Sequence, residues 1–133
     1  MRIEELSIGD WVCAEQLCGV HNDPRLTPPM KVVGLGESWV NLEIDPEQGD
    51  PFEFEPSEIS GVPITPGILE KNGVALAEDY DEYSALYTCP QFSVIKYRDG
   101  YTFEVPQARV RVEYIHELQH AIRLAGIEKE IEL

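Results

Sequence analysis

The sequence is poor in positive charge. It contains 10 Lys and Arg against 25 Asp and Glu, which gives a formal net charge of -15. A surface of this sign repels phosphate backbones, so direct binding to nucleic acid is not expected. No Lys or Arg occurs between Glu37 and Glu58. This acidic stretch indicates a solvated surface, with contact to a basic protein partner or mimicry of nucleic acid as the alternatives.

The sequence also lacks long apolar runs and an even set of cysteines. No run is long enough to cross a bilayer, and Met1–Glu5 shows no signal-peptide core, so neither membrane insertion nor export is expected. The three cysteines, Cys13, Cys18 and Cys89, are expected to be free thiols in a reducing cytoplasm. A hydrophobic content of 43% in 133 residues is sufficient for a packed core in one domain or two very small ones.

The first half of the sequence predicts short strands separated by turns. Two adjacent Pro and an Asn-Asp-Pro run make His21–Pro29 an expected loop. Ser57–Ile59 is expected to be a helical turn. Several short strands at close spacing predict an SH3-like small β-barrel over residues 1–64. The expected strands are Trp11–Leu17, Met30–Leu35, Trp39–Ile44 and Phe52–Glu55.

Residues 65–133 are expected to form a small antiparallel α+β unit with a C-terminal helix, packed with the barrel as one compact body. Thr65 and Pro66 are suited to begin a short helix, which Gly73 would end. Asp99-Gly100 is a strong hairpin signal. The expected strands lie near Tyr83–Thr88, Phe92–Arg98, Tyr101–Val105 and Ala108–Val112, and the final helix runs from about Glu113 to Ala125.

Residues 116–120 spell H-E-L-Q-H, the H-E-x-x-H pattern of zinc metallopeptidases. On a helix, His116 and His120 would lie one turn apart and could bind one Zn²⁺. Glu117 could then act as general base on a zinc-bound water. The pattern therefore raises a zinc-dependent hydrolase as an alternative function.

The surrounding residues favour a structural role for this helix. A helical projection places both His with Arg123 on a polar side, opposite an apolar face. A third ligand is not evident, because only 13 residues follow His120 and His21 forms no obvious cluster with the cysteines. We therefore expect no catalytic residue, metal or cofactor. The apolar face would consist of Tyr114, Ile115, Leu118, Ala121, Ile122 and Ala125.

Three segments carry distinctive patterns: Leu6–Val12 (L-x-I-G-D-W-V), Pro63–Gly73 (P-I-T-x-x-I-L-x-K-N-G) and Tyr114–Gln119. With these segments the chain resembles a family of short uncharacterised proteins encoded by gut bacteria and their phages or mobile elements. The family pattern has Asn at the position of His120 and commonly Gln at that of Glu117. The resemblance thus implies that H-E-x-x-H arose by two substitutions in a structural helix, and it implies no activity or cofactor.

The expected function is that of a small cytoplasmic binding or accessory protein without enzymatic activity, of phage or mobile-element origin. Trp11, Trp39 and Tyr101 are candidate contacts for a protein partner, which the acidic stretch suggests is basic. Trp11 and Trp39 could form an aromatic pair, although at least one of them is expected to pack in the core. The sequence does not identify the partner or the oligomeric state.

Overall fold

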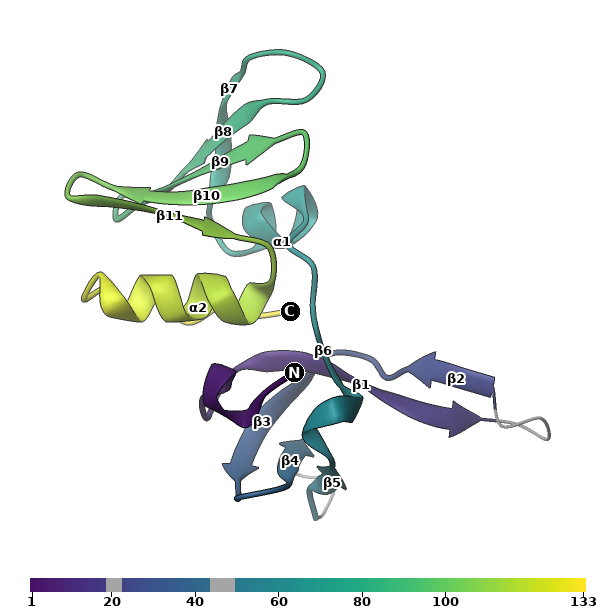
Figure 1. The fold of residues 1–133 in the computed structure, drawn as a ribbon. Helices are drawn as coiled ribbons and strands as arrows, with labels where there is room; N and C mark the ends of the chain where they lie inside the picture. The colour runs from purple at the N-terminus through teal and green to yellow at the C-terminus, as the bar shows by residue number, and fades with distance from the viewer. Residues whose placement is uncertain (19–22, 44–49) are drawn as a thin grey trace. The chain divides into compact units, whose positions relative to one another are not determined.

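The computed structural model describes residues 1–18, 23–43 and 50–133 of the chain (Figure 1). The chain divides into two compact units, Met1–Val62 (unit 1) and Pro63–Leu133 (unit 2). Strands predominate in both, and the two α-helices of the described residues lie in unit 2, so the fold is α+β as the sequence predicts. Neither of these helices has the length and apolar character that a membrane span requires.

Unit 1 is a curled antiparallel sheet with β1 at its centre (Figure 1). Strand β6 pairs with one side of β1, while β2 and β3 pair in succession with the other. Strands β4 and β5 extend the sheet beyond β3. The elements are η1 (Ile3–Glu5), β1 (Trp11–Cys18), β2 (Asp23–Leu26), β3 (Met30–Leu35), β4 (Val40–Glu43), β5 (Phe52–Phe54), η2 (Pro56–Glu58) and β6 (Ile59–Gly61).

The core of unit 1 follows the alternation of its strands. Val40 and Leu42 of β4 are fully buried, whereas Asn41 and Glu43 between and after them are half-buried. The expected Ile44 on the same face lies outside the described residues. The buried apolar cluster consists of Leu6, Val12, Ala14, Met30, Val32, Val40, Leu42 and Ile59.

The turn before β1 holds the start of the sheet together. The N–H of Gly9 donates to the carbonyl of Val32 at 2.7 Å, and the N–H of Val32 donates to the carbonyl of Asp10 at 2.9 Å. Gly9 has φ +93°, a conformation that suits glycine. The buried Asp10 carboxylate accepts the N–H of Ser7 at 2.8 Å. The segment that begins the family resemblance therefore has a structural role here.

The expected loop at His21–Pro29 is wrong for part of its length, because Asp23–Leu26 is strand β2. Pro24 pairs with Leu17 at the edge of the sheet, where the missing N–H of proline breaks no ladder to a further strand. Ile59–Gly61 is likewise a strand, while the expected helical turn just before it is confirmed as η2. His21 lies outside the described residues.

Thr27 joins β2 to β3 along one side of β1. Its N–H donates to the carbonyl of Ala14 at 2.7 Å, and its Oγ1 accepts the N–H of Ala14 at 2.9 Å. Thr27 and Ala14 are both buried. The hydroxyl therefore replaces a backbone acceptor at the point where the two strands are interrupted.

Unit 2 is a five-stranded antiparallel meander in the order β11-β10-β9-β8-β7, with a helix before it and a helix after it (Figure 1). Its core includes Phe92 and Phe103, whose ring centroids are 5.2 Å apart. The elements are α1 (Pro66–Lys71), β7 (Ala75–Asp79), β8 (Ala85–Thr88), β9 (Ser93–Tyr97), β10 (Gly100–Val105), β11 (Ala108–Val112) and α2 (Ile115–Leu124).

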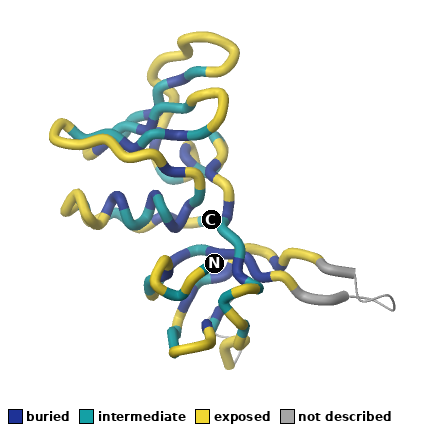
Figure 2. The backbone as a smooth tube through the Cα atoms, in the orientation of Figure 1, coloured by how far each residue is buried: buried dark blue, intermediate teal, exposed yellow. Residues whose placement is uncertain are grey.

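The local signals of unit 2 are confirmed where the sequence is specific. Thr65 caps α1 by accepting the N–H of Ile68 at 3.2 Å, and Gly73 follows the helix with φ +79°. Gly100 pairs with Tyr97 at the tip of the β9–β10 hairpin. Strand β7 is not predicted by the sequence, since every one of its residues is exposed and no alternation marks it (Figure 2).

The C-terminal tail is fastened to α1 by one side chain. The carboxamide of Asn72 donates through Nδ2 to the carbonyl of Glu132 at 2.8 Å, and its Oδ1 accepts the N–H of Glu132 at 2.7 Å. The same Nδ2 also donates to the carbonyl of Ile68 at 2.8 Å. Ile131, next to this contact, is buried in the core. Asn72 therefore pairs with the tail as a neighbouring strand would.

Candidate functional site

Glu117 caps the start of α2. Its Oε1 accepts the backbone N–H of Tyr114 at 3.0 Å and that of Glu113 at 2.9 Å. Both N–H groups precede or begin the helix, where no intrahelical acceptor exists. A glutamate at the third helical position that reaches back in this way is half of a capping box. The geometry thus assigns Glu117 a structural task at the place where the zinc alternative needs a general base.

The two histidines of the motif have different surroundings. His116 is buried and its ring lies nearly parallel to that of Tyr114, with centroids 5.8 Å apart. His120 is half-buried, with its ring edge-on to that of His116 at 5.9 Å. The expectation that both lie on a polar side is therefore wrong for His116. In the first turn of α2, residues on more than one side of the helix are buried, including Ile115, His116 and Leu118.

The described residues bring no third ligand to the histidine pair. Within residues 1–18, 23–43 and 50–133, no three His, Cys, Asp or Glu side chains gather into a metal-holding group. Cys13 is buried in unit 1, and its burial raises the pKa of the thiol. His21 and the side chain of Cys18 lie outside the described residues.

The candidate partner contacts differ in their exposure. Trp11 is half-buried with Lys31 Nζ 5.1 Å from its ring centroid, and Trp39 is 37% exposed, so the expectation that one tryptophan packs in the core is wrong. Trp39 covers Gly36, where an added Cβ would lie 2.2 Å from the indole. Tyr101 is buried in the core of unit 2, where burial raises its pKa, so it offers no contact surface.

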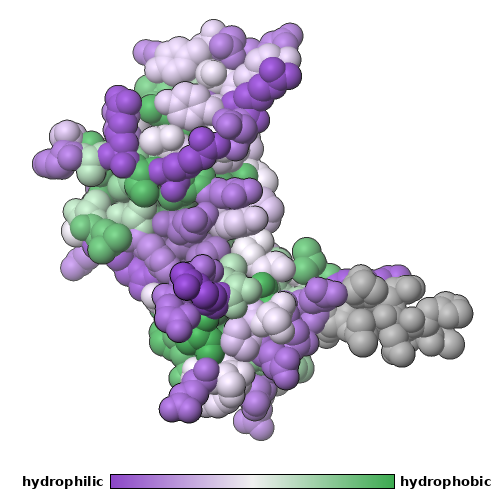
Figure 3. Space-filling model, viewed as in Figure 1, coloured by the Kyte–Doolittle hydropathy of each residue, from purple (hydrophilic) through white to green (hydrophobic). Residues whose placement is uncertain are grey.

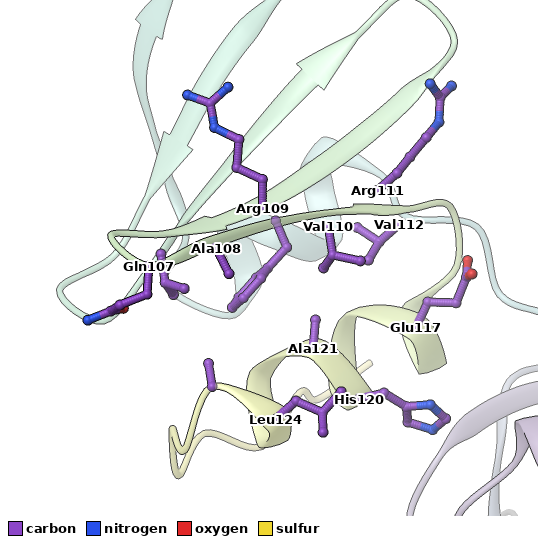
Figure 4. A pocket seen from close by; sticks show the side chains of 13 residues that line it. Gln107, Ala108, Arg109, Val110, Arg111, Val112, Glu117, His120, Ala121 and Leu124 are labelled. Atoms are coloured by element: carbon purple, nitrogen blue, oxygen red, sulfur yellow. The ribbon is translucent and has the colours of Figure 1, made fainter.

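A groove of about 590 Å³ lies in unit 2 between β11 and α2. Figure 4 shows Ala108, Val110 and Val112 pointing from β11 toward the helix, and Ala121 pointing back. Figure 3 shows hydrophobic surface where the end of α2 faces the β10–β11 hairpin. The lining residues are Phe103, Val105, Gln107, Ala108, Arg109, Val110, Arg111, Val112, Glu117, His120, Ala121, Leu124 and Ala125.

Small residues at the end of α2 leave this groove open. Ala121 and Ala125 are too short to fill the space beneath the sheet, and Ala125 is exposed although the projection placed it on the core face. Val110 remains 48% exposed and Leu124 90% exposed. Val110 and Ala121 point toward one another across the groove, and Leu124 lies at its rim (Figure 4). An apolar lining of this kind is the usual composition of a ligand groove. Leu124, an apolar residue outside the predicted core face, was the available sequence signal.

The outer edge of β11 is open next to the groove. The N–H of Ile64 donates to the carbonyl of Glu113 at 3.2 Å, and Pro63 forms an isolated β-bridge with Tyr114. Residues 63 and 64 therefore pair with the edge just beyond the end of β11. Peptide groups alternate between the two sides of a strand, so those of Arg109 and Arg111 also face outward. Among the described residues, no backbone group pairs with them on that side.

Two arginines mark the face of β11 that points away from the groove (Figure 4). Arg109 Nε lies 2.9 Å from Glu104 Oε2, and Arg111 Nη2 lies 3.1 Å from Asp99 Oδ2. The hydrogen bond from Arg111 lowers the pKa of Asp99. The arginine side chains nevertheless remain 69% and 66% exposed. The edge therefore presents apolar side chains on one face and exposed, carboxylate-paired arginines on the other.

None of the family models, curated proteins or solved structures compared with this chain matches it. The groove and the open edge beside it are thus the features from which a function can be argued.

Proposed function

We propose that this protein is a small, non-enzymatic binding protein whose unit 2 holds an extended segment of a partner protein. The observation that carries this proposal is the position of the groove directly beside the open edge of β11. An edge strand supplies backbone hydrogen bonds to an added strand, and an adjacent apolar groove receives its alternate side chains. Exposed apolar surface of this kind is a common mark of a protein contact site.

We further propose that unit 1 is an SH3-like barrel with a supporting or second binding role. Its support is the order of its elements, in which a meander ends in η2 and a short β6 returns to pair with β1. Trp11 and Trp39 are both partly exposed on this unit. A cytoplasmic location and a phage or mobile-element origin remain part of the same proposal.

Selection from a library of random peptides tests the binding function. Peptides enriched on the protein are expected to bind a Leu124→Glu variant about tenfold more weakly, because a charge would stand at the apolar rim of the groove. Leu124 is 90% exposed, so the substitution does not disturb the core. Leu26→Glu, at a 60% exposed position of unit 1, is the matched control and should leave binding unchanged. Enriched peptides that ignore Leu124→Glu would refute the groove as the binding surface.

A further inference from the structure

The open part of the β11 edge is short and has a defined direction. Pro63 and Ile64 run antiparallel to residues 113 and 114, and the chain then leaves the edge at Thr65, which caps α1. The N–H and C=O groups of Arg109 and Arg111 remain for a further strand. The five strands of unit 2 all pair antiparallel, and Pro63 already bridges this edge in the same sense, so an added antiparallel strand continues the pattern of the sheet.

A strand added here would meet two different environments on its two faces. Side chains directed to the groove would contact Val110, Ala121 and Leu124. Side chains directed the other way would lie beside Arg109 and Arg111. The present partners of these arginines, Glu104 and Asp99, lie on β10 and in the β9–β10 turn, on the inner side of the edge. Each guanidinium has five N–H donors, so its outward flank can receive a further carboxylate.

The same arginines disfavour a second copy of this chain as the occupant. An antiparallel pair of two β11 strands that is centred on Val110 and keeps their apolar faces together would set each arginine opposite an arginine of the other copy. Like charges directly opposite one another destabilise a strand pair, whereas opposite charges stabilise it. The edge is therefore complementary to acidic side chains rather than to itself.

We propose that the groove takes an extended segment in which apolar and acidic residues alternate, added to β11 as an antiparallel strand. The apolar residues enter the groove, and the acidic residues pair with Arg109 and Arg111. This inference rests on the proposed function and specifies its partner. It departs from the basic partner suggested by the net charge, which is negative for unit 2 as well, with 7 Lys and Arg against 12 Asp and Glu. The two exposed arginines lie directly at the open edge, whereas charges beyond about 8 Å are screened at physiological salt.

Peptide titrations test this preference for acidic residues. They are monitored through the backbone amide NMR signals of Arg109 and Arg111. The probes are a short blocked peptide that alternates valine with glutamate and two companions with lysine or serine in place of glutamate. The glutamate peptide is expected to shift both amides and to bind about five- to tenfold more tightly than the lysine peptide. Arg109→Glu combined with Arg111→Glu should reverse this preference. Arg109→Gln combined with Arg111→Gln should remove the preference for glutamate, and because it leaves Glu104 and Asp99 without their arginine partners, the lysine peptide should then bind at least as tightly.

The outcomes separate this inference from the function on which it rests. If the three peptides bound equally and all shifted the β11 amides, the preference for acidic residues would be overturned, and the groove would remain a binding surface. Shifts confined to other strands, or no shift at millimolar glutamate peptide, would overturn the inference. If the library selection also yielded no peptide sensitive to Leu124→Glu, the proposed function would fail with it.

Discussion

Two side chains, Glu117 and Asn72, satisfy backbone groups that the secondary structure of unit 2 leaves unpaired. Glu117 accepts two N–H groups at the start of α2, and Asn72 pairs with both backbone groups of Glu132. Three of these four hydrogen bonds are solvent-exposed and one is half-buried, so each is expected to contribute about 0.5–1.5 kcal/mol. Single substitutions at these two positions therefore test how unit 2 is held together.

Replacing Glu117 by alanine is expected to lower the free energy of unfolding by about 1 kcal/mol, since two N–H groups lose their acceptor. Glu117→Gln keeps an oxygen acceptor and should cost less than half as much. Urea denaturation monitored by circular dichroism measures both changes. Glu113→Ala, an exposed neighbour whose side chain does not cap the helix, is the control.

The zinc alternative makes opposite predictions for the same helix. A general base would lose its chemistry in Glu117→Gln, with little change in stability. Metal analysis of untagged protein would give one zinc per chain, lost in His120→Asn. We expect instead that His120→Asn changes neither metal content nor stability appreciably, since Asn keeps a polar side chain at this half-buried position. Stoichiometric zinc in the unmodified protein would favour the hydrolase.

Replacing Asn72 by alanine is expected to release the C-terminal tail. The substitution removes three hydrogen bonds, and the free energy of unfolding should fall by about 1–3 kcal/mol. Hydrogen exchange at the amide of Glu132 should accelerate more than exchange in β9 or β10. Asn72→Asp retains the acceptor for Glu132 and loses the donor, so its effect should be intermediate. Unchanged exchange at Glu132 would show that Ile131 alone holds the tail.

At the level of elements, the sequence predicts those whose signal is local. Helix α1 has both its cap and its terminal glycine, and the β9–β10 hairpin has its Asp-Gly. Strands β2 and β7 escape prediction because both lie at sheet edges, where proline and fully exposed residues are tolerated. These strands form by pairing with other segments of the chain, and the local sequence pattern does not predict that pairing.

The candidate site was not predictable for a related reason. A groove is a property of two elements and of the space between them. The alternation at Ala108–Val112 predicts a strand, and the apolar face of α2 predicts a docking helix. Neither indicates that Ala121 and Ala125 leave Val110 uncovered. The buried state of His116 escaped the helical projection, because that projection assumes a single packed side.

The junction of β2 and β3 depends on the hydroxyl of Thr27. Thr27→Val keeps the shape of the side chain but leaves the buried N–H of Ala14 without its acceptor, at a cost of about 1–3 kcal/mol in the free energy of unfolding. Thr27→Ser keeps the hydroxyl and should be affected far less. Urea titration of tryptophan fluorescence measures both. A Val variant as stable as the Ser variant would mean that the hydroxyl does not support the strand junction.

On the scale of the whole molecule, the aromatic residues divide between the two units. Both Trp lie in unit 1 and all six Tyr lie in unit 2. Each unit also has its own buried apolar residues. Tryptophan emission therefore reports on unit 1, and the ring NMR signals of tyrosine report on unit 2, without any added label.

We expect the two units to unfold as separate cooperative transitions. Thr27→Val should then lower the urea midpoint of the tryptophan signal and leave the tyrosine signal in place. Asn72→Ala should do the reverse. Following both signals in one titration of each variant provides the measurement. Equal displacement of both midpoints by either substitution would show instead that the chain unfolds as one cooperative body.

Because Glu117 caps its helix, the position of H-E-x-x-H relative to the start of the helix has diagnostic value. A glutamate reaches the helix start only from the first turn, so strand residues must end just before the motif, as Val112 does here. Where a full helical turn precedes the first His, the neighbouring backbone N–H groups are already bonded and the carboxylate is free for chemistry. An alternating strand pattern that runs up to H-E-x-x-H therefore distinguishes a capping glutamate from a candidate base by sequence alone.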